Sequence, residues 1–199
     1  DFLHDDRANL VIAWPMRLYD CSPVSDGAAT LLLVAEDLAK NFTDKALHII
    51  GSGQASDMTM RYRSDMTSMP SVRAAAQKAF DMAGVKPEDI KVAEVHDCFT
   101  IAEILATEDL GFFKPGQGFE AAEEGVTSRQ GPRPINTSGG LKSKGHPVGA
   151  TGTGQVIEVW KQLRGEAGNR QLPGDPHLGL THNVGGTGET AFVHIFERR

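Results

Sequence analysis

Two side chains that can do chemistry lie two residues apart near the middle of the chain. His96 and Cys98 follow an apolar run over residues 90–95, and an imidazole beside a thiol can move protons or activate a nucleophile. If the chain stays extended there, its two-residue alternation sends both side chains to the same side. The alternative is structural, with Cys98 as a small buried residue and His96 as a hydrogen-bonded core histidine. No further ligands accompany the pair at a familiar spacing, so no metal site is predicted.

A second histidine lies inside a glycine-rich segment. His146 falls within residues 139–152, just before a stretch with helical spacing. A rigid loop of this kind can hold an imidazole in a defined place. The other interpretation is a backbone turn that leads into a helix, whose free N–H groups suit anions such as phosphate.

The third candidate lies near the end of the sequence. His182 and Asn183 end a strand-like run, and Val184 and several glycines follow them. Polar groups at a strand end can direct backbone N–H groups toward an oxyanion. A tight turn between the last two strands would explain the same pattern without any chemistry.

The elements that must position these residues alternate between apolar runs of strand length and amphipathic stretches of helix length. This alternation predicts an α/β layered fold. Ser71 is the expected N-cap of a helix that Gly84 ends, and Gly51 and Gly53 are expected to close a strand. His96 then lies at a strand-to-helix junction, where functional polar side chains are common. The expected strands span residues 10–14, 28–35, 46–51, 90–95, 178–183 and 190–196, and the expected helices span 71–83, 99–108, 121–125 and 150–163.

Charge and composition exclude several classes of function. A formal net charge of −6 argues against a general nucleic-acid binder, because phosphate affinity requires concentrated Lys and Arg. Two cysteines far apart, in a chain without a secretory leader, favour a reducing compartment, and we expect a cytoplasmic protein. No apolar run approaches the roughly 20 residues that a membrane-spanning helix needs.

Together, in this order and at these separations, the three segments resemble the C-terminal signature blocks of the thiolase superfamily. His96-Asp97-Cys98-Phe99 resembles the first block of sterol-carrier-protein thiolases and archaeal acetoacetyl-CoA thiolases, where other thiolases have an Asn-Glu-Ala-Phe type of sequence. Residues 145–147 match the Gly-His-Pro block. Residues 182–186 replace the usual Cys-x-Gly block, and residues 20–29 are similar to the strand that leads out of the family's N-terminal domain.

The resemblance implies two similar α/β halves, each a mixed five-stranded sheet covered by helices. On this basis we expect residues 1–56 to form the final segment of a thiolase N-terminal domain and residues 57–199 the C-terminal domain. The family's nucleophilic cysteine lies upstream of the matching region. We therefore expect neither Cys21 nor Cys98 to be the nucleophile, and we expect this chain alone to be inactive.

The activity that the resemblance implies is acyl transfer, as Claisen condensation or thiolytic cleavage of a 3-ketoacyl-CoA such as acetoacetyl-CoA. Coenzyme A thioesters would be the substrates, and no tightly bound cofactor is expected. In this chemistry His146 activates the nucleophile, and His96 donates a hydrogen bond to the thioester oxygen of the enolate. Cys98 acts as the acid or base at the α-carbon.

Four further residues acquire expected roles from the same resemblance. His182 stands where the usual catalytic cysteine stands, and Asn183 beside it would orient its neighbours. The Val184 N–H group would contribute to an oxyanion hole, and Ser22 aligns with a serine that contacts pantetheine. Basic side chains that could meet coenzyme A phosphates, or could simply be solvated surface charges, are Arg61, Arg63, Lys142 and Lys144.

Two other interpretations remain open. A retro-aldolase on the thiolase fold would use the same thioester cavity without an acyl-cysteine, but that group carries tyrosine in the first block. Alternatively, the chain is an inactive fragment or a subunit that needs a partner chain, such as a missing N-terminal half. Thiolases form dimers or tetramers, so we expect a homo-oligomer, with a small OB-fold partner of the kind that archaeal thiolases recruit as a further candidate.

Overall fold

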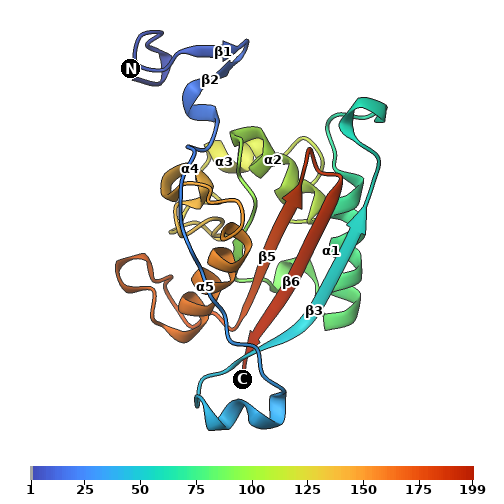
Figure 1. The fold of residues 1–199 in the computed structure, drawn as a ribbon, viewed down its shortest axis with the longest axis vertical. Helices are drawn as coiled ribbons and strands as arrows, with labels where there is room; N and C mark the ends of the chain where they lie inside the picture. The colour runs from blue at the N-terminus through green and yellow to red at the C-terminus, as the bar shows by residue number, and fades with distance from the viewer. Residues whose placement is uncertain (1) are drawn as a thin grey trace.

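The computed structural model describes residues 2–199, along which strands alternate with helices (Figure 1). This alternation confirms the predicted α/β class. The strands are β1 (Val11–Ala13), β2 (Met16–Arg17), β3 (Leu47–Ser56), β4 (Val92–Glu94), β5 (Leu178–Gly185) and β6 (Thr190–Arg198), and the α-helices are α1 (Pro70–Ala83), α2 (Thr100–Asp109), α3 (Gly118–Glu123), α4 (Gly140–Lys144) and α5 (Thr151–Arg164).

Four strands form one mixed sheet in the order β3–β6–β5–β4. Strand β6 is antiparallel to β3 and β5, whereas β4 is parallel to β5. The resemblance implied five strands, and within residues 2–199 the fifth position beside β4 holds only one bridge, between Ala93 and Ile135. A strand cannot continue there, because Pro134 has no N–H to donate and Asn136 adopts a left-handed φ of 51°.

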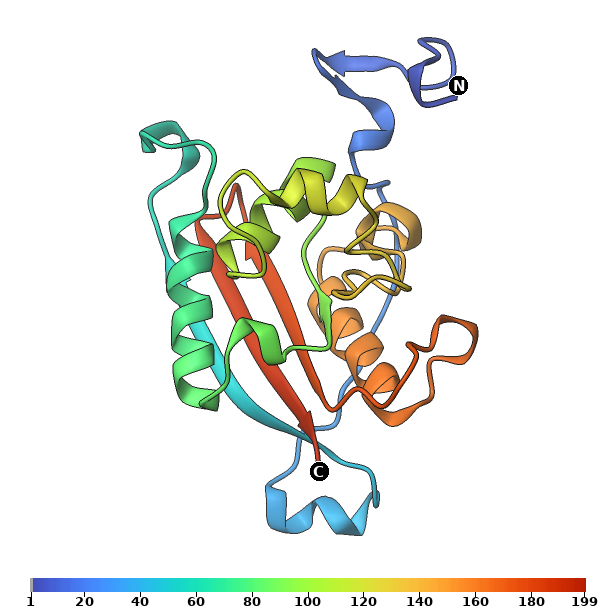
Figure 2. The ribbon, with the colours of Figure 1, turned by 180° about the vertical axis from the view of Figure 1, so that it is seen from behind.

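Helices cover both faces of this sheet. Helix α1 packs on β3 and β6, and α5 packs on β4 and β5. Leu180 and Ile195 belong to the core beneath α1, whereas Phe196 belongs to the second core with Val159 of α5. Seen from behind, α1 lies in front of the sheet (Figure 2). The period-two alternation of β6 thus sends Ile195 and Phe196 to different cores, whereas Leu178, Leu180 and Val184 of β5 all belong to the core beneath α1.

The glycines of β3 do not close the strand, so that expectation is wrong. β3 runs through Gly51 and Gly53 and pairs with β6 as far as Ser56. A Cβ atom at Gly53 would lie 1.9 Å from the carbonyl oxygen of Ala75 in α1. The glycines therefore let the helix backbone approach the sheet. Residues 47–56 share a sheet with β6, which belongs to the predicted C-terminal domain. The expected domain boundary after residue 56 stays a prediction.

Helix α1 begins differently from the prediction and ends as predicted. The N-cap position is Met69, whose N–H donates to the Asp109 carboxylate at 2.6 Å. Ser71 is not the cap, because it is buried and its hydroxyl donates to the carbonyl of Gly188 at 2.6 Å. Gly84 ends the helix with a left-handed φ of 66°.

The expected strand at residues 28–35 is wrong. In the described part of the chain this segment pairs with no strand, and Leu32 and Leu33 are 70% and 73% exposed. An apolar run becomes a strand only where a neighbouring strand satisfies its backbone groups. Figure 1 shows the segment running beside α4 and α5, between the projecting β1–β2 pair and the short 3-10 helix Glu36–Asn41.

Most of the other predicted elements form near their expected positions, whereas β2 and α4 were not predicted. The hairpin of β5 and β6 forms around the predicted glycine turn, and the short helix expected at residues 121–125 lies slightly earlier, as α3. Over residues 2–199, every helix is too short or too polar to cross a membrane.

Candidate active site

Parallel strands β4 and β5 bring two of the three candidate histidines together. Val92, Ala93 and Glu94 of β4 are fully buried, and the chain leaves the strand to deliver His96 before α2 begins at Thr100. The C-terminal ends of parallel strands share one edge of a sheet. His182, in the second half of β5, therefore lies beside this junction, and its Nδ1 atom accepts a hydrogen bond from the His96 N–H at 3.4 Å.

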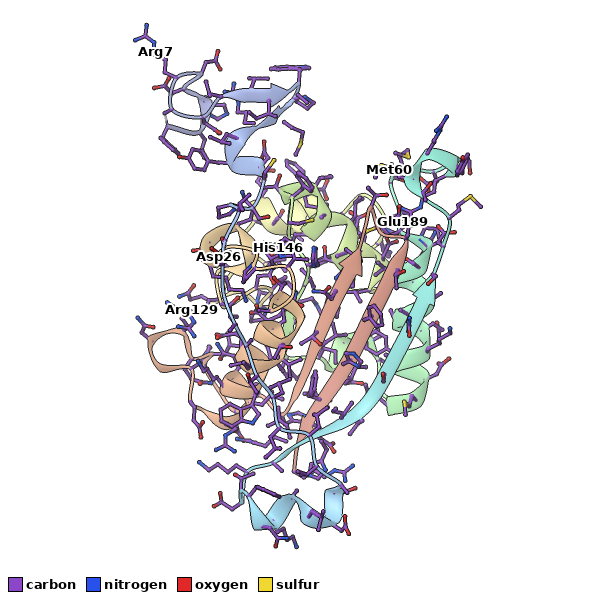
Figure 3. The ribbon with its side chains drawn as sticks, in the orientation of Figure 1. Arg7, Asp26, Met60, Arg129, His146 and Glu189 are labelled. Atoms are coloured by element: carbon purple, nitrogen blue, oxygen red, sulfur yellow. The ribbon has the colours of Figure 1, made fainter. Side chains whose placement is uncertain are left out.

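The third histidine reaches the same place from the glycine-rich segment. The His96 and His146 rings meet edge to face, with their centroids 4.9 Å apart. His146 follows α4 and its Nδ1 lies 2.7 Å from the Thr151 hydroxyl oxygen, at the start of α5. Figure 3 shows His146 between α5 and the C-terminal part of β5 in that view. Three segments that are distant in the sequence thus supply one cluster of imidazoles.

The three imidazoles are uncharged at neutral pH. Burial lowers the pKa of His182 to about 3 and that of His96 to about 4. Burial also lowers the pKa of His146, although the carboxylate of Asp97 opposes the shift. Among the described atoms, His96 Nδ1 and His182 Nε2 are buried without a hydrogen-bond partner. Such nitrogens are suited to bond a polar ligand atom.

Cys98 is half-buried two residues after His96. Burial raises the pKa of its thiol above the usual range, and the nearby Asp97 carboxylate adds to that effect. The Ser22 N–H donates to the Cys98 carbonyl at 2.9 Å, and Cys21 and Phe99 form the adjoining bridge. Ser22 is therefore beside Cys98. A protonated thiol suits an acid role better than that of a ready nucleophile.

Asp97 connects the first histidine to the segment that carries His146. It is 2% exposed, and its carboxylate accepts a hydrogen bond from the backbone N–H of Leu141 at 2.8 Å and a longer one from the backbone N–H of Lys142 at 3.4 Å. Gly140 has no room for a side chain, because an added Cβ would lie 2.1 Å from Asp97 Oδ2. This contact explains one of the glycines in the segment.

Asn183 and Val184 lie on opposite sides of β5. The Asn183 amide donates to Gln155 Oε1 of α5 at 3.0 Å, so the side chain faces the helix and not the imidazole of His182. Val184 is buried in the main core and pairs opposite Ala191 of β6. The alternation of a strand separates neighbours in this way.

The basic side chains that were considered for phosphate binding have partners within the chain. The Arg63 side chain is 5% exposed, forms an ion pair with Asp57 at 3.1 Å and donates to the carbonyls of the β5–β6 turn. It therefore holds that turn in place. Lys142 Nζ donates to the Cys21 carbonyl at 2.5 Å, and Lys144 Nζ lies 3.7 Å from a Glu94 oxygen. Arg61 stacks near Tyr62.

Sequence reasoning missed several polar residues around the cluster. Glu94 is fully buried, its carboxylate accepts from the Ser138 N–H at 3.0 Å, and burial raises its pKa to about 7. Asn136 accepts from the Val95 N–H and donates to Glu103, both within 2.8 Å. The hydrogen-bond partners of these residues lie in other segments of the chain, so the spacing of residues in the sequence did not indicate them. The one available indication was that Glu94 lies two residues before His96.

A mixed sheet covered by helices, with imidazoles gathered where two parallel strands end, defines an α/β domain of the kind found in enzymes. Residues 52–198 match the family model described as thiolase C-terminal domain-like. The chain therefore belongs to the thiolase C-terminal domain family, which confirms the resemblance inferred from its motifs.

Curated relatives carry the same relationship over most of the chain. The acetyl-CoA acetyltransferase of Methanothermobacter thermautotrophicus is 52% identical over 189 residues, which are 94% of this chain and 49% of that protein. Sterol carrier protein 2 of Bos taurus is 39% identical over 176 residues, which are 85% of this chain and 32% of the relative. The chain thus spans about half or less of the relatives it matches.

Two solved structures resemble the fold. The Ltp2-ChsH2(DUF35) aldolase superposes with a TM-score of 0.84 and 27% identity over 98% of this chain and 51% of that chain. A monomeric SCP2-thiolase-like protein from Mycobacterium smegmatis has a TM-score of 0.54 and 16% identity over 76% of this chain and 28% of its own. The second likeness concerns the fold alone.

Proposed function

We propose that this chain supplies the C-terminal part of an acyl-CoA acyltransferase of the thiolase kind, acting on a 3-ketoacyl-CoA such as acetoacetyl-CoA. The observation that carries the proposal is the convergence of His96, His146 and His182 in one uncharged cluster, in which His96 and His182 are buried and His146 is partly buried. Membership of the family and 52% identity with an acetyl-CoA acetyltransferase support it. The acyl-accepting cysteine would belong to sequence outside these 199 residues.

In this proposal each member of the cluster has one task. His146 is uncharged and only partly buried, so it can accept a proton from a thiol and return it. His96 and His182 each present a buried nitrogen, and an N–H there would stabilise the charge that develops on the thioester oxygen. Cys98, with its raised pKa, would exchange the proton at the α-carbon.

Ser22 and the β5 residues have supporting tasks. Because Ser22 adjoins Cys98, it is suited to contact the pantetheine arm of a thioester that reaches the cluster. Asn183 would position α5 against β5 through Gln155. The Val184 N–H is proposed as an oxyanion donor.

A chimera tests the proposal. The matching segment of the Methanothermobacter acetyl-CoA acetyltransferase is replaced by this chain, and cleavage of acetoacetyl-CoA by coenzyme A is measured. We expect activity, and we expect His146→Ala to reduce it at least tenfold, which corresponds to about 1.4 kcal/mol of transition-state stabilisation. Asp81→Asn, on exposed α1 surface, is the control. A folded chimera without activity, or with activity that His146→Ala leaves within about tenfold, would contradict the proposal.

One observation favours a second candidate, a retro-aldolase that cleaves a carbon–carbon bond of a CoA thioester. It is the likeness to the Ltp2-ChsH2(DUF35) aldolase, at a TM-score of 0.84. The two activities differ in their need for a cysteine nucleophile, because an aldolase forms no acyl-enzyme. Replacing the nucleophilic cysteine of the chimera should abolish thiolase activity, whereas aldol cleavage of a 3-hydroxyacyl-CoA would survive.

The state of association is also part of the proposal. Exposed apolar side chains of residues 31–34 line a groove of about 930 Å³ with Trp160 of α5 and Ile49 of β3. Exposed apolar surfaces of this kind are usually covered by another chain or domain. We propose a homo-oligomer, with an additional partner subunit as the second alternative, and the name of the Ltp2-ChsH2(DUF35) structure supports the latter.

A further inference from the structure

His146 has one fixed neighbour at its Nδ1 atom, the hydroxyl of Thr151. The two atoms are 2.7 Å apart, and Thr151 is the first residue of α5 and 4% exposed. The same hydroxyl lies 3.1 Å from the Pro147 carbonyl oxygen, one turn earlier. The Pro147 carbonyl also accepts from the N–H groups of Ala150 and Thr151, at 2.8 and 3.0 Å, so the hydroxyl hydrogen has two available acceptors, Pro147 O and His146 Nδ1.

The hydrogen atoms of these three groups can be counted. A threonine hydroxyl has one hydrogen, and when it donates to the carbonyl four residues earlier, as threonines near helix starts commonly do, only lone pairs remain for His146. The imidazole must then donate from Nδ1. In a neutral imidazole only one nitrogen carries hydrogen, so Nε2 keeps its lone pair.

We infer that Thr151 is a positioning residue that holds His146 as the Nδ1–H tautomer and so leaves Nε2 free to accept a proton. This inference rests on the proposed function, in which His146 is the base. It also holds when His146 is doubly protonated, because Nδ1–H remains the donor to Thr151 in both states. The imidazole can therefore take up and release a proton at Nε2 without any rearrangement.

A purely structural account of Thr151 is the alternative. Near helix starts, serine and threonine often bond the carbonyl of the preceding turn, as Thr151 does with Pro147. Thr107 in α2 offers a matched comparison, because it is 2% exposed and its hydroxyl donates to the Ile104 carbonyl at 2.8 Å. Within residues 2–199, no hydrogen bond joins the Thr107 side chain to a histidine of the cluster.

Imidazole tautomers are read directly by NMR of the ¹⁵N-labelled 199-residue chain, at a pH where His146 is neutral. We expect His146 of the parent to show a protonated Nδ1 and an unprotonated Nε2. Thr151→Val should shift the population away from Nδ1–H, whereas Thr151→Ser, which keeps the hydroxyl, should restore the parent pattern. Thr107→Val should leave the His146 signals unchanged while removing an equivalent buried hydroxyl.

Each outcome decides the inference. A dominant Nε2–H form in the parent, or an unchanged Nδ1–H form in Thr151→Val, would overturn it, and so would failure of Thr151→Ser to restore the pattern. Should Thr151→Val not fold, Thr151→Ala carries the same test. Because tautomers are measured without substrate, failure of this inference is distinct from failure of the acyltransferase proposal, which the chimera tests.

Discussion

The buried position of His182 predicts a measurable dependence of stability on pH. Its pKa is about 3 in the folded chain, against an ordinary value of 6.5 that the unfolded chain should show. A group whose folded pKa is depressed contributes stability above its unfolded pKa and loses it as the pH falls, since the unfolded chain binds the proton first. The loss therefore begins near pH 6.5 and continues down to about pH 3.

The size of the effect follows from these two values. Between pH 7 and pH 5 the linkage relation gives a loss of about 2 kcal/mol for His182. The result hardly depends on the folded pKa, because a value of 3 or of 4 lies well below pH 5 in either case. His96 should lose a similar amount, since its folded pKa is about 4.

Glu94 acts in the opposite sense. Burial raises its pKa from 4.5 to about 7, so it contributes stability at low pH that is lost as the pH rises through 7. As the pH falls from 7 to 5, Glu94 offsets about 2 kcal/mol of the loss from the two histidines. The pH dependence of the parent alone is therefore not informative, and a comparison with a variant is required.

The assay is urea denaturation of the parent and His182→Gln at a series of pH values. Glutamine keeps an acceptor for the His96 N–H but cannot titrate. Between pH 7 and pH 5 the parent should lose about 2 kcal/mol more than the variant. His177→Gln, at an exposed position, is the control and should follow the parent. If the curves of the parent and His182→Gln run parallel, His182 is not held neutral by burial and the reasoning fails.

Three further predictions concern reactivity, packing and association. Incubation of the chain with acyl-CoA should leave its intact mass unchanged, and a stoichiometric acyl adduct on Cys21 or Cys98 would show that the nucleophile had been assigned wrongly. Gly53→Ala should lower the free energy of unfolding by about 1–3 kcal/mol, because its Cβ would meet the Ala75 carbonyl at 1.9 Å, whereas Gly154→Ala in α5 meets nothing within 4 Å and should be neutral or stabilising. Light scattering at micromolar concentration should show a species larger than 21.4 kDa, and a stable monomer that binds no hydrophobic dye would contradict the proposed association.

Several elements could be predicted from the sequence because their causes are local. Helix α1 shows its buried face in the spacing of Val72, Ala76 and Phe80, and Gly84 marks its end. The β5–β6 hairpin is indicated by two strand-like runs joined by glycines. The order of the three histidine-bearing segments was sufficient to predict the family, which the match over residues 52–198 confirms. Roles for the individual site residues stay predictions.

Other features depend on neighbours that are distant along the chain. The run at residues 28–35 has the composition of a strand, yet a strand also needs a partner, and within residues 2–199 none lies beside it. From the sequence alone, Gly53 is interpreted as a turn residue. Its role in letting α1 approach the sheet is visible only once the position of the Ala75 carbonyl is known. Local sequence does not contain either fact.

The tertiary structure also decided the electrostatics of the candidate site. The sequence contains His96, His146 and His182 as ordinary histidines, and nothing in their spacing fixes a protonation state. The parallel ends of β4 and β5 and the Asp97 contact with α4 bring them together, bury His96 and His182, and partly bury His146. Burial then lowers each pKa, because a charged imidazole loses hydration that the surrounding chain does not replace.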